Sequence, residues 1–357
     1  MPRVSVIIPS YNHATFIARA IESVLRQDFD DFELLVEDDG SADNTENVLK
    51  SFSDSRLSYV LNEINSGAGI VTERLIKRAK GEYIALLNSD DSWAQGKLSA
   101  QVSWLDAHPE TAACFTRATF IDESDNPTSE GSFSYANVFD VENRSAGAWL
   151  RHFFYKGNCL CNPSVMIRAT VFDDIGTYKN ILRQLPDLEF WIRLLKKHSI
   201  HVLDKQYVNM RIMKDGSNAS SELGSNAERI LLEYSLILEN YFEDMDIGHL
   251  KEGFGDLLRD KEISNIHQYQ INTAFLYFQP AIAGLQPILG LIGCRKLYKL
   301  MNDAATREIL RTQYAFSETE FQQLGVYGSV FLPRHLTYPS WYRTASRLYR
   351  RLFPRKP

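Results

Sequence analysis

The chain has 357 residues, of which 44% are hydrophobic and 24% charged, and this composition excludes a disordered or fibrous protein. Its length exceeds what one hydrophobic core usually serves, so we expect two units, residues 1–225 and a mainly helical region at 226–357. The net charge of −6 excludes bulk affinity for nucleic acid. Four cysteines without zinc spacing, and an apolar start too short for a signal peptide, predict a cytoplasmic protein with reduced thiols.

Residues 4–115 alternate between short apolar runs, which predict strands, and segments with helical periodicity. The strands are expected at 4–8, 32–36, 57–61, 83–87 and 112–115. The helices are expected at 17–25, 68–79 and 97–105, with another through Val48, Leu49 and Phe52. Because these strands are apolar throughout rather than at every second position, they predict a mostly parallel, Rossmann-like α/β sheet with helices on both faces.

Polar side chains follow three of these strands. In open α/β sheets the ligand binds where the strands end, so the residues at each end are candidates for a site. They are Pro9, Ser10 and Tyr11 after the first strand, Glu37, Asp38 and Asp39 after the second, and Asn88, Ser89, Asp90 and Asp91 after the fourth. Together these residues predict a site for a cation and for hydroxyl groups.

Phosphate binding at this site would need a metal ion. Neither G-x-G-x-x-G after the first strand nor G-x-x-x-x-G-K-[ST] occurs in the sequence, so dinucleotide binding and a phosphate-loop ATPase are not supported. Magnesium and manganese prefer oxygen ligands and commonly bridge one or two carboxylates to substrate phosphates, and Asp90 and Asp91 can supply these carboxylates. The alternative is that both residues only cap the turn that follows.

Further along the chain, the segment 184–197 predicts a helix with an apolar face and Pro186 in its first turn. Asp187 then lies at the helix start, where the helix dipole favours a charged carboxylate. It serves either as a helix cap or as a functional carboxylate. The polar stretch 122–139 predicts a loop, and residues 227–301 predict mostly helix.

Several ordered motifs resemble those of glycosyltransferase family 2. They are VSVIIPSYNHATFIARAIESVL, FELLVEDDGSADNT, N-x-G at 65–67, AKGEYIALLNSDDSWAQGKL, GNCLCNPSVMI, LPDLEFWIRLL and YVNMRIMKDGSNAS. The resemblance implies a GT-A fold, a nucleotide-diphosphate sugar as donor with UDP as the commonest nucleotide, a divalent metal (Mn²⁺ or Mg²⁺), and inversion at the anomeric carbon. It divides the first unit into a nucleotide-sugar half, about 1–115, and an acceptor half, about 116–225.

The resemblance also implies roles for single residues. The expected donor-binding residues are Pro9, Tyr11, Asp38, Asp39, Asn88, Ser89 and Asp91. The family's D-x-D falls on Asn88, Ser89 and Asp90, so Asp90 is the expected metal ligand and Asn88 the expected ribose contact. Asp187 matches the catalytic base, which takes the proton of the acceptor hydroxyl, and Glu189 is the reserve candidate.

Three positions depart from the family pattern. Asn88 replaces the first acid of D-x-D and brings no charge to a metal ion. Thr72 and Glu73 stand where many members have Arg-Asn, so an arginine contact cannot be transferred there. Met213 replaces a histidine, and methionine is a poor ligand for a hard ion. The basic residues nearest to it, Arg211 and Lys214, either neutralise phosphate or are plain surface charge.

Residues 334–357 are rich in arginine and contain no acidic residue. A helix at 341–353 would place Trp341, Leu348 and Leu352 on one side and arginines on the other, which suits an anionic membrane surface. The alternative is a helix packed on the protein's own core. Contact with a membrane would favour a peripheral location on the inner face of the cell membrane and a lipid-linked acceptor, as in surface polysaccharide synthesis.

Other residues carry two interpretations each. Cys159 and Cys161 alternate along a strand, which predicts one core thiol and one loop thiol rather than a metal pair. Trp93 and Trp191 either stack on a sugar or are buried by packing. His13 either approaches the donor or is a solvated loop residue.

Two other functions compete with transfer to a hydroxyl. One is transfer of a sugar to polyprenyl phosphate, an acceptor that is already an anion and needs no base. The other is a degenerate sugar-nucleotide-binding module, which Asn88 and Met213 make conceivable.

Overall fold

The computed structural model describes residues 1–128, 138–213, 225–282 and 284–331. It divides into two compact units. The first contains Met1–Phe153 and Gly157–Ala227, and the second contains Phe154–Lys156 and the chain from Glu228 onward. Lys214 and the basic segment 334–357, with its expected helix at 341–353, lie outside the described residues.

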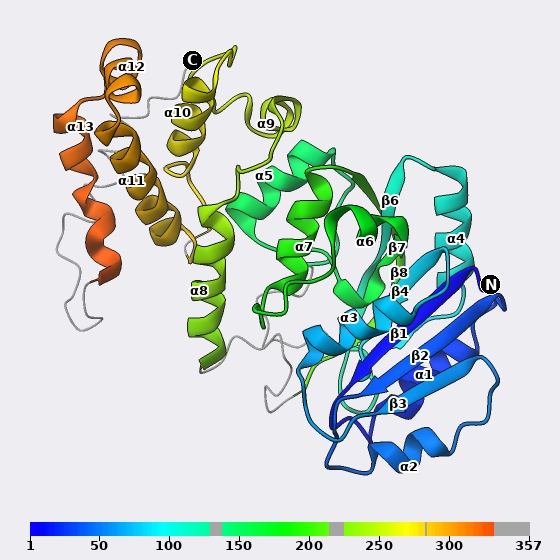
Figure 1. Cartoon of the computed structure of the whole chain (residues 1–357). Helices are drawn as coiled ribbons and strands as arrows, with labels where there is room; N and C mark the ends of the chain where they lie inside the picture. Colours follow the sequence, from blue (N-terminus) through cyan, green and yellow to red (C-terminus); the bar gives the residue numbers. More distant parts are fainter. Residues whose placement is uncertain (129–137, 214–224, 283, 332–357) are drawn as a thin grey trace. The chain divides into compact units, whose positions relative to one another are not determined.

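The first unit is built on an eight-stranded sheet with the order β3-β2-β1-β4-β7-β6-β8-β5 (Figure 1). The strands are β1 (Val4–Ser10), β2 (Phe32–Asp38), β3 (Leu57–Leu61), β4 (Tyr83–Leu86), β5 (Ser92–Trp93), β6 (Thr111–Ile121), β7 (Met166–Arg168) and β8 (Ser199–Arg211). The pairs β1·β2, β2·β3, β1·β4 and β6·β8 are parallel. The pairs β4·β7, β6·β7 and β5·β8 are antiparallel, so the sheet is mixed around its parallel N-terminal half.

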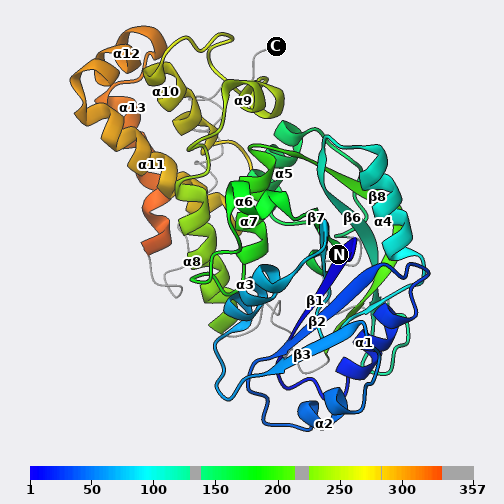
Figure 2. The same ribbon diagram turned by 45° about the vertical axis from the view of Figure 1, so that its right-hand side comes forward.

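Helices cover both faces of the parallel strands, as the apolar strands predicted. The helices and 3₁₀ turn of this unit are α1 (Ile17–Leu25), α2 (Thr45–Lys50), α3 (Ala68–Arg78), α4 (Lys97–Ala107), α5 (Ala146–Lys156), η1 (Asn162–Ser164), α6 (Thr170–Ile175) and α7 (Pro186–Leu195). Alternate β1 residues such as Val4, Val6 and Ile8 join one core cluster with Ile17 of α1 and Leu49 of α2. Figures 1 and 2 show α3 on the opposite face of β1 and β2.

The second unit is helical. It contains α8 (Ser225–Glu239, from Glu228), α9 (Ile247–Phe254), α10 (Ile266–Leu276), α11 (Gln286–Asn302), α12 (Ala304–Tyr314), α13 (Glu318–Gln322) and η2 (Gln323–Phe331). The end of α5 supplies Phe154 to an aromatic core with Tyr241, Phe242, Phe254 and Tyr277. Among the described residues, no helix is long and apolar enough to cross a membrane. The predicted α/β sheet with a C-terminal helical extension is confirmed.

Candidate active site

The loops that follow β1, β2 and β4 meet at one edge of the sheet. The Asp39 amide donates a hydrogen bond to the Ser10 carbonyl (2.8 Å), which joins the first two loops. His13 Nδ1 lies 2.7 Å from Ser89 Oγ, which joins the first loop to the third. The structure therefore brings the three predicted strand ends together, and His13 is part of their contact.

Asp38 and Asp39 are buried, and their carboxylates hold two loops in place. Asp38 accepts hydrogen bonds from the amide and the hydroxyl of Ser41, at 2.9 and 2.6 Å. Asp39 accepts from the amides of Ser66 and Gly67, at 2.8 and 2.7 Å, immediately before α3. The backbone of Gly67 has φ +96°, a conformation that side-chain-bearing residues rarely adopt. Because each carboxylate oxygen can accept more than one hydrogen bond, the pair also has capacity for a ligand.

The end of β1 supplies an aromatic ring and a buried hydroxyl. Tyr11 is 46% exposed and Pro9 is half-buried. Ser10 is 3% exposed, and its Oγ has no hydrogen-bond partner among the described residues. A buried polar group without a partner costs about 1–3 kcal/mol, and a ligand that bonded to it would recover this energy. Ser10 is therefore a further candidate contact for a polar ligand.

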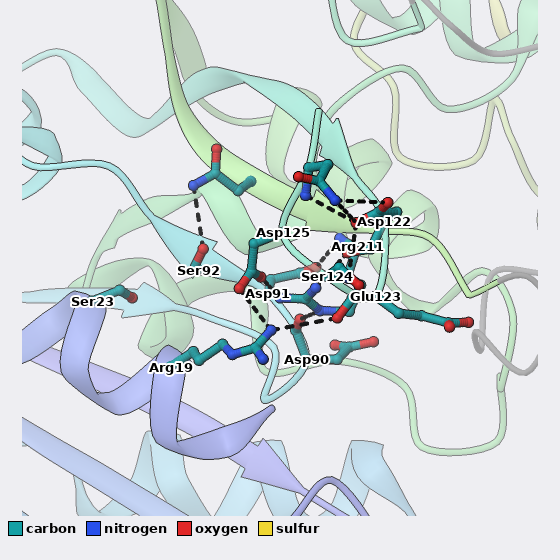
Figure 3. Close-up of polar contacts among 12 residues, drawn as sticks. Arg19, Ser23, Asp90, Asp91, Ser92, Asp122, Glu123, Ser124, Asp125 and Arg211 are labelled. Carbon is teal, nitrogen blue, oxygen red and sulfur yellow. Dashed lines mark hydrogen bonds and ion pairs between the residues drawn. The ribbon is translucent and has the colours of Figure 1, made fainter. Parts of the chain in front are cut away.

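Asp90 and Asp91 are adjacent in the sequence but have different surroundings. Asp91 is buried and accepts hydrogen bonds from Asn88 Nδ2 (2.9 Å) and from the Arg211 amide (2.8 Å). Burial and the neighbouring Asp90 charge raise the pKa of Asp91 well above its usual value. The Asp90 carboxylate is partly exposed, and no described residue hydrogen-bonds to it (Figure 3). Asp90 thus has a carboxylate left for a ligand, whereas that of Asp91 holds the loop together.

A divalent ion at Asp90 would have few protein ligands. Within the described ranges, no group of three or more His, Cys, Asp or Glu side chains could hold a metal ion. The Asn88 amide uses its Nδ2 for Asp91, which leaves its Oδ1 available. One carboxylate and one amide oxygen suit an ion whose other ligands are diphosphate oxygens and water. The residues present therefore fit a metal that binds together with a diphosphate.

Asp187 lies in the first turn of α7, as predicted. Its Oδ2 accepts a 2.7 Å hydrogen bond from Asn158 Nδ2, and its Oδ1 accepts from the Leu188 amide at 2.8 Å. The N-cap of α7 is Leu185, so Asp187 does not occupy the cap position. Burial raises the pKa of the Cys161 thiol, and the charges of Asp91 and, more weakly, Asp187 raise it further. The carboxylates of Asp187 and of Asp91, in the loop after β4, therefore both raise the pKa of the same buried thiol.

Glu189, the reserve candidate for the base, is engaged in ion pairs. It is 7% exposed and lies 2.8 Å from both Lys179 Nζ and Arg193 Nε. Arg193 is fixed in turn by the Thr177 carbonyl at 2.8 Å. A carboxylate held by two cations in a buried position is suited to structure rather than to proton transfer.

Arg211 differs from both sequence-based interpretations. Its side chain is 0% exposed, so it is not surface charge. Its guanidinium donates to the carbonyls of Asp90 (2.8 Å) and Asp122 (2.5 Å) and pairs with Asp125. Asp125 also pairs with Arg19 at 2.7 Å. Neither Asp125 nor Arg19 stands out in the sequence, because their partners are about a hundred residues away.

The two tryptophans and the two neighbouring cysteines are core residues. Trp93 and Trp191 are 4% and 0% exposed, and Trp93 Nε1 donates to the Pro163 carbonyl at 2.9 Å. They are therefore not available to stack on a sugar. Cys159 and Cys161 are both buried, Cys161 belongs to the core cluster of the sheet, and neither lies on a strand, so the expectation that they alternate along a strand was wrong. The strand predicted there is replaced by η1 and the short strand β7, which explains the error.

A family model decides the classification. The model named Glycosyl transferase family 2 matches residues 5–170, a segment that contains all three strand-end loops. Residues 5–170 therefore form a glycosyl transferase family 2 domain. The resemblance seen in the motifs is therefore confirmed.

Three curated relatives show the extent of this likeness. The UDP-Glc:alpha-D-GlcNAc-diphosphoundecaprenol beta-1,3-glucosyltransferase WfgD of Escherichia coli is 45% identical over 102 residues, which are 29% of this chain and 40% of WfgD. TuaG of Bacillus subtilis, provisionally named a teichuronic acid biosynthesis glycosyltransferase, is 40% identical over 106 residues, 29% of this chain and 42% of TuaG. An uncharacterized glycosyltransferase of Rickettsia felis is 29% identical over 246 residues, 68% of this chain and 39% of the relative. The chain thus spans about two fifths of the length of each relative.

Solved structures of S. aureus TarS share the fold. The structure of residues 1–349 in complex with UDP-GlcNAc has a TM-score of 0.52 at 19% identity, and the match covers 90% of this chain and 92% of that one. A longer TarS structure has a TM-score of 0.54 at 17% identity, with 99% and 55% covered. At this identity the likeness concerns the fold, and it confirms the predicted GT-A architecture.

Proposed function

We propose that the chain is an inverting glycosyltransferase that moves a sugar from a nucleotide-diphosphate sugar to a hydroxyl group of an acceptor. The observation that carries this proposal is the partly exposed Asp90 carboxylate at the edge of a GT-A sheet, without a partner among the described residues. The match of residues 5–170 to the family model supports the reaction class.

The first three strand ends would bind the donor. Asp38 and Asp39 are placed for the base or ribose, and Tyr11 offers a half-exposed ring beside them. UDP is the expected nucleotide, which is supported by the UDP-Glc in the name of WfgD and by the UDP-GlcNAc bound to TarS. Asp90, with Asn88 Oδ1, would hold Mn²⁺ or Mg²⁺. When bound, such an ion neutralises charge on the departing diphosphate.

Asp187 would act as the general base. The acceptor hydroxyl loses its proton only as its bond to the anomeric carbon forms, so an ordinary carboxylate suffices. The hydrogen bond from Asn158 orients Oδ2, and the position at the start of α7 favours the ionised carboxylate. The acceptor would lie between Asp187 and the donor, in the half of the first unit at about 116–225.

The names of two relatives support a class of acceptor. The name of WfgD specifies a diphosphoundecaprenol-linked acceptor, and that of TuaG refers to a cell-wall polymer. We therefore propose a lipid-linked glycan as acceptor, in surface polysaccharide synthesis on the inner face of the cell membrane. The basic segment 334–357 would contact the anionic surface, and deletion of 335–357 is expected to abolish flotation with anionic liposomes.

The test combines donor binding with transfer. A panel of nucleotide-sugars with Mn²⁺ is expected to raise the melting temperature for one donor, because a ligand that binds only the native state stabilises it. Asp187→Asn is then expected to bind this donor normally and to lose at least 100-fold in transfer rate, roughly the contribution of a general base. Asp173→Asn removes an equal charge from the exposed surface of α6 and is the control.

The outcomes separate the competing functions. Transfer that survives in Asp187→Asn would remove Asp187 as base and favour a polyprenyl-phosphate acceptor. Donor binding without transfer or donor hydrolysis would favour a binding module, the alternative suggested by Asn88 and Met213. A panel in which no donor stabilises the chain would refute the proposed function.

A further inference from the structure

A tight turn at residues 122–126 follows β6 at the edge of the candidate site (Figure 3). Asp122 closes it, because its Oδ1 accepts from the amides of Ser124 (2.8 Å) and Asn126 (2.9 Å). The Asp122 amide also donates to the Asn126 carbonyl at 2.9 Å. Asp125 has φ +67°, a left-handed conformation that Asp and Asn tolerate better than other side-chain-bearing residues. The turn thus presents the Asp125 carboxylate in a defined position.

The Asp125 carboxylate bridges two arginines from distant elements. Its Oδ2 lies 2.7 Å from Arg19 Nη1 of α1, and its Oδ1 lies 2.5 Å from Arg211 Nη2 of β8. The pKa of Asp125, which burial alone would raise, is lowered by Arg211 and then by Arg19. The Arg211 side chain is 0% exposed, and a buried guanidinium is costly unless a counter-charge and hydrogen bonds compensate it. Asp125 provides that counter-charge.

Two other donors of Arg211 bind the loop that carries Asp90. Nε donates to the main-chain carbonyl of Asp90 at 2.8 Å, and the backbone amide of Arg211 donates to Asp91 Oδ1 at 2.8 Å. Nη1 donates to the Asp122 carbonyl. The guanidinium therefore contacts the peptide of Asp90, while the carboxylate of the same residue has no partner in the described part of the chain. Figure 3 shows this arrangement.

We propose that Asp125 is a positioning residue for the donor site, which it serves by holding the Arg211 guanidinium on the backbone of Asp90 and away from the Asp90 carboxylate. The inference rests on the proposed function, because it assigns the freed carboxylate to a metal bound with a nucleotide diphosphate. Arg19, whose side chain is partly exposed, contributes by pairing with Asp125 Oδ2, the oxygen that does not pair with Arg211.

Neutralising Asp125 would remove its ion pair with the buried Arg211 guanidinium. Arg211 already contacts Asp91 Oδ1 through its amide and the Asp90 carbonyl through Nε, and of these two acidic residues only Asp90 has a carboxylate without hydrogen bonds from described residues. A guanidinium that turns to the Asp90 carboxylate competes with the cation for the same oxygens. The expected defect is a weaker metal site in a folded protein.

The experiment measures Mn²⁺ binding directly, from the electron paramagnetic resonance signal of free Mn²⁺ in the presence of saturating UDP. Asp125→Asn keeps the size of the side chain and its tolerance for φ > 0 but removes the charge. We expect its Mn²⁺ affinity to fall about tenfold, equivalent to about 1.4 kcal/mol. Its transfer rate is expected to return to within about twofold of wild type at saturating Mn²⁺, a recovery that general loosening of the fold would not produce.

Two further variants complete the test. Glu123→Gln removes the same charge from the same turn and is expected to leave Mn²⁺ affinity unchanged. Arg19→Met weakens the bridge from its exposed end and is expected to lower Mn²⁺ affinity two- to fourfold, which keeps the inference testable if Asp125→Asn fails to fold. If both Asp125→Asn and Arg19→Met bind Mn²⁺ with wild-type affinity, the inference about Asp125 is overturned and the proposed metal site is not. Absence of Mn²⁺ binding in the wild-type chain would overturn the proposed metal site and the inference with it.

Discussion

Lys97, at the start of α4, is buried in the core of the first unit, and Lys97→Met tests what this burial costs. The residue is 0% exposed, its Nζ donates to Gln101 Oε1 at 2.7 Å, and the ammonium lies 3.8 Å from the centre of the Trp93 ring. Burial lowers the pKa of Lys97 from its usual 10.5 to about 7. In the sequence, Lys97 is only the first residue of the helix predicted at 97–105.

The lowered pKa makes stability depend on pH in a defined direction. Between about pH 7 and 10.5 the unfolded chain binds a proton at Lys97 that the folded chain does not, so the free energy of unfolding rises with pH across this window. Each pH unit inside the window contributes about 1.4 kcal/mol, so wild type should gain roughly 2–3 kcal/mol between pH 7 and 9. The Trp93 face favours the ammonium form and reduces this gain. Below pH 7 the full cost of the buried charge remains.

Urea unfolding of wild type and Lys97→Met from pH 6 to 9.5 measures the effect. Tryptophan fluorescence suits this assay, since Trp93, Trp104, Trp149 and Trp191 all belong to the first unit. Lys97→Met should be less stable than wild type at pH 9, by about 1–3 kcal/mol, because Gln101 Oε1 loses its donor. This deficit should shrink or reverse toward pH 6. Lys80→Met, at an exposed lysine of the same unit, should run parallel to wild type, and a parallel Lys97→Met curve would refute the reasoning.

Three other predictions concern packing and the buried charges. Gly81→Ala should destabilise the first unit by about 1–3 kcal/mol in urea unfolding, because its Cβ would lie 2.5 Å from the Ser5 amide nitrogen, whereas Gly325→Ala meets nothing within 4 Å and should have little effect. Because Glu189 pairs with Lys179 and Arg193, Glu189→Gln should lower the free energy of unfolding by about 2 kcal/mol. The folded variant should retain transfer activity. A variant that is fully folded but inactive would instead make Glu189 the base. Burial raises the pKa of the thiols of Cys114, Cys159 and Cys294 to about 12 and that of Cys161 well above its usual value. Ellman's reagent at pH 8 should therefore react slowly with the native chain and rapidly in urea. A fast reaction with the native chain would contradict these raised pKa values.

The sequence by itself determined the sheet and the edge that carries the candidate site. Apolar strand runs, helical periodicity and the polar residues after β1, β2 and β4 are local features, and the right-handed α/β arrangement places such strand ends together. The order of the motifs also identified the family. The strands β5 to β8 were less predictable, because β8 alternates in burial and pairs with β6 across register shifts.

Only the tertiary structure decided what each charged residue does. Asp90 and Asp91 look alike in the sequence. The Asp91 carboxylate accepts a hydrogen bond from the Arg211 amide, 120 residues away, whereas the Asp90 carboxylate accepts none from described residues. Arg211 resembled a phosphate ligand or surface charge until its burial and its pairing with Asp125 were visible. The protonation and the direction of a charged side chain depend on its burial and on partners far away in the sequence. The residues next to it in the sequence reveal neither its burial nor those partners.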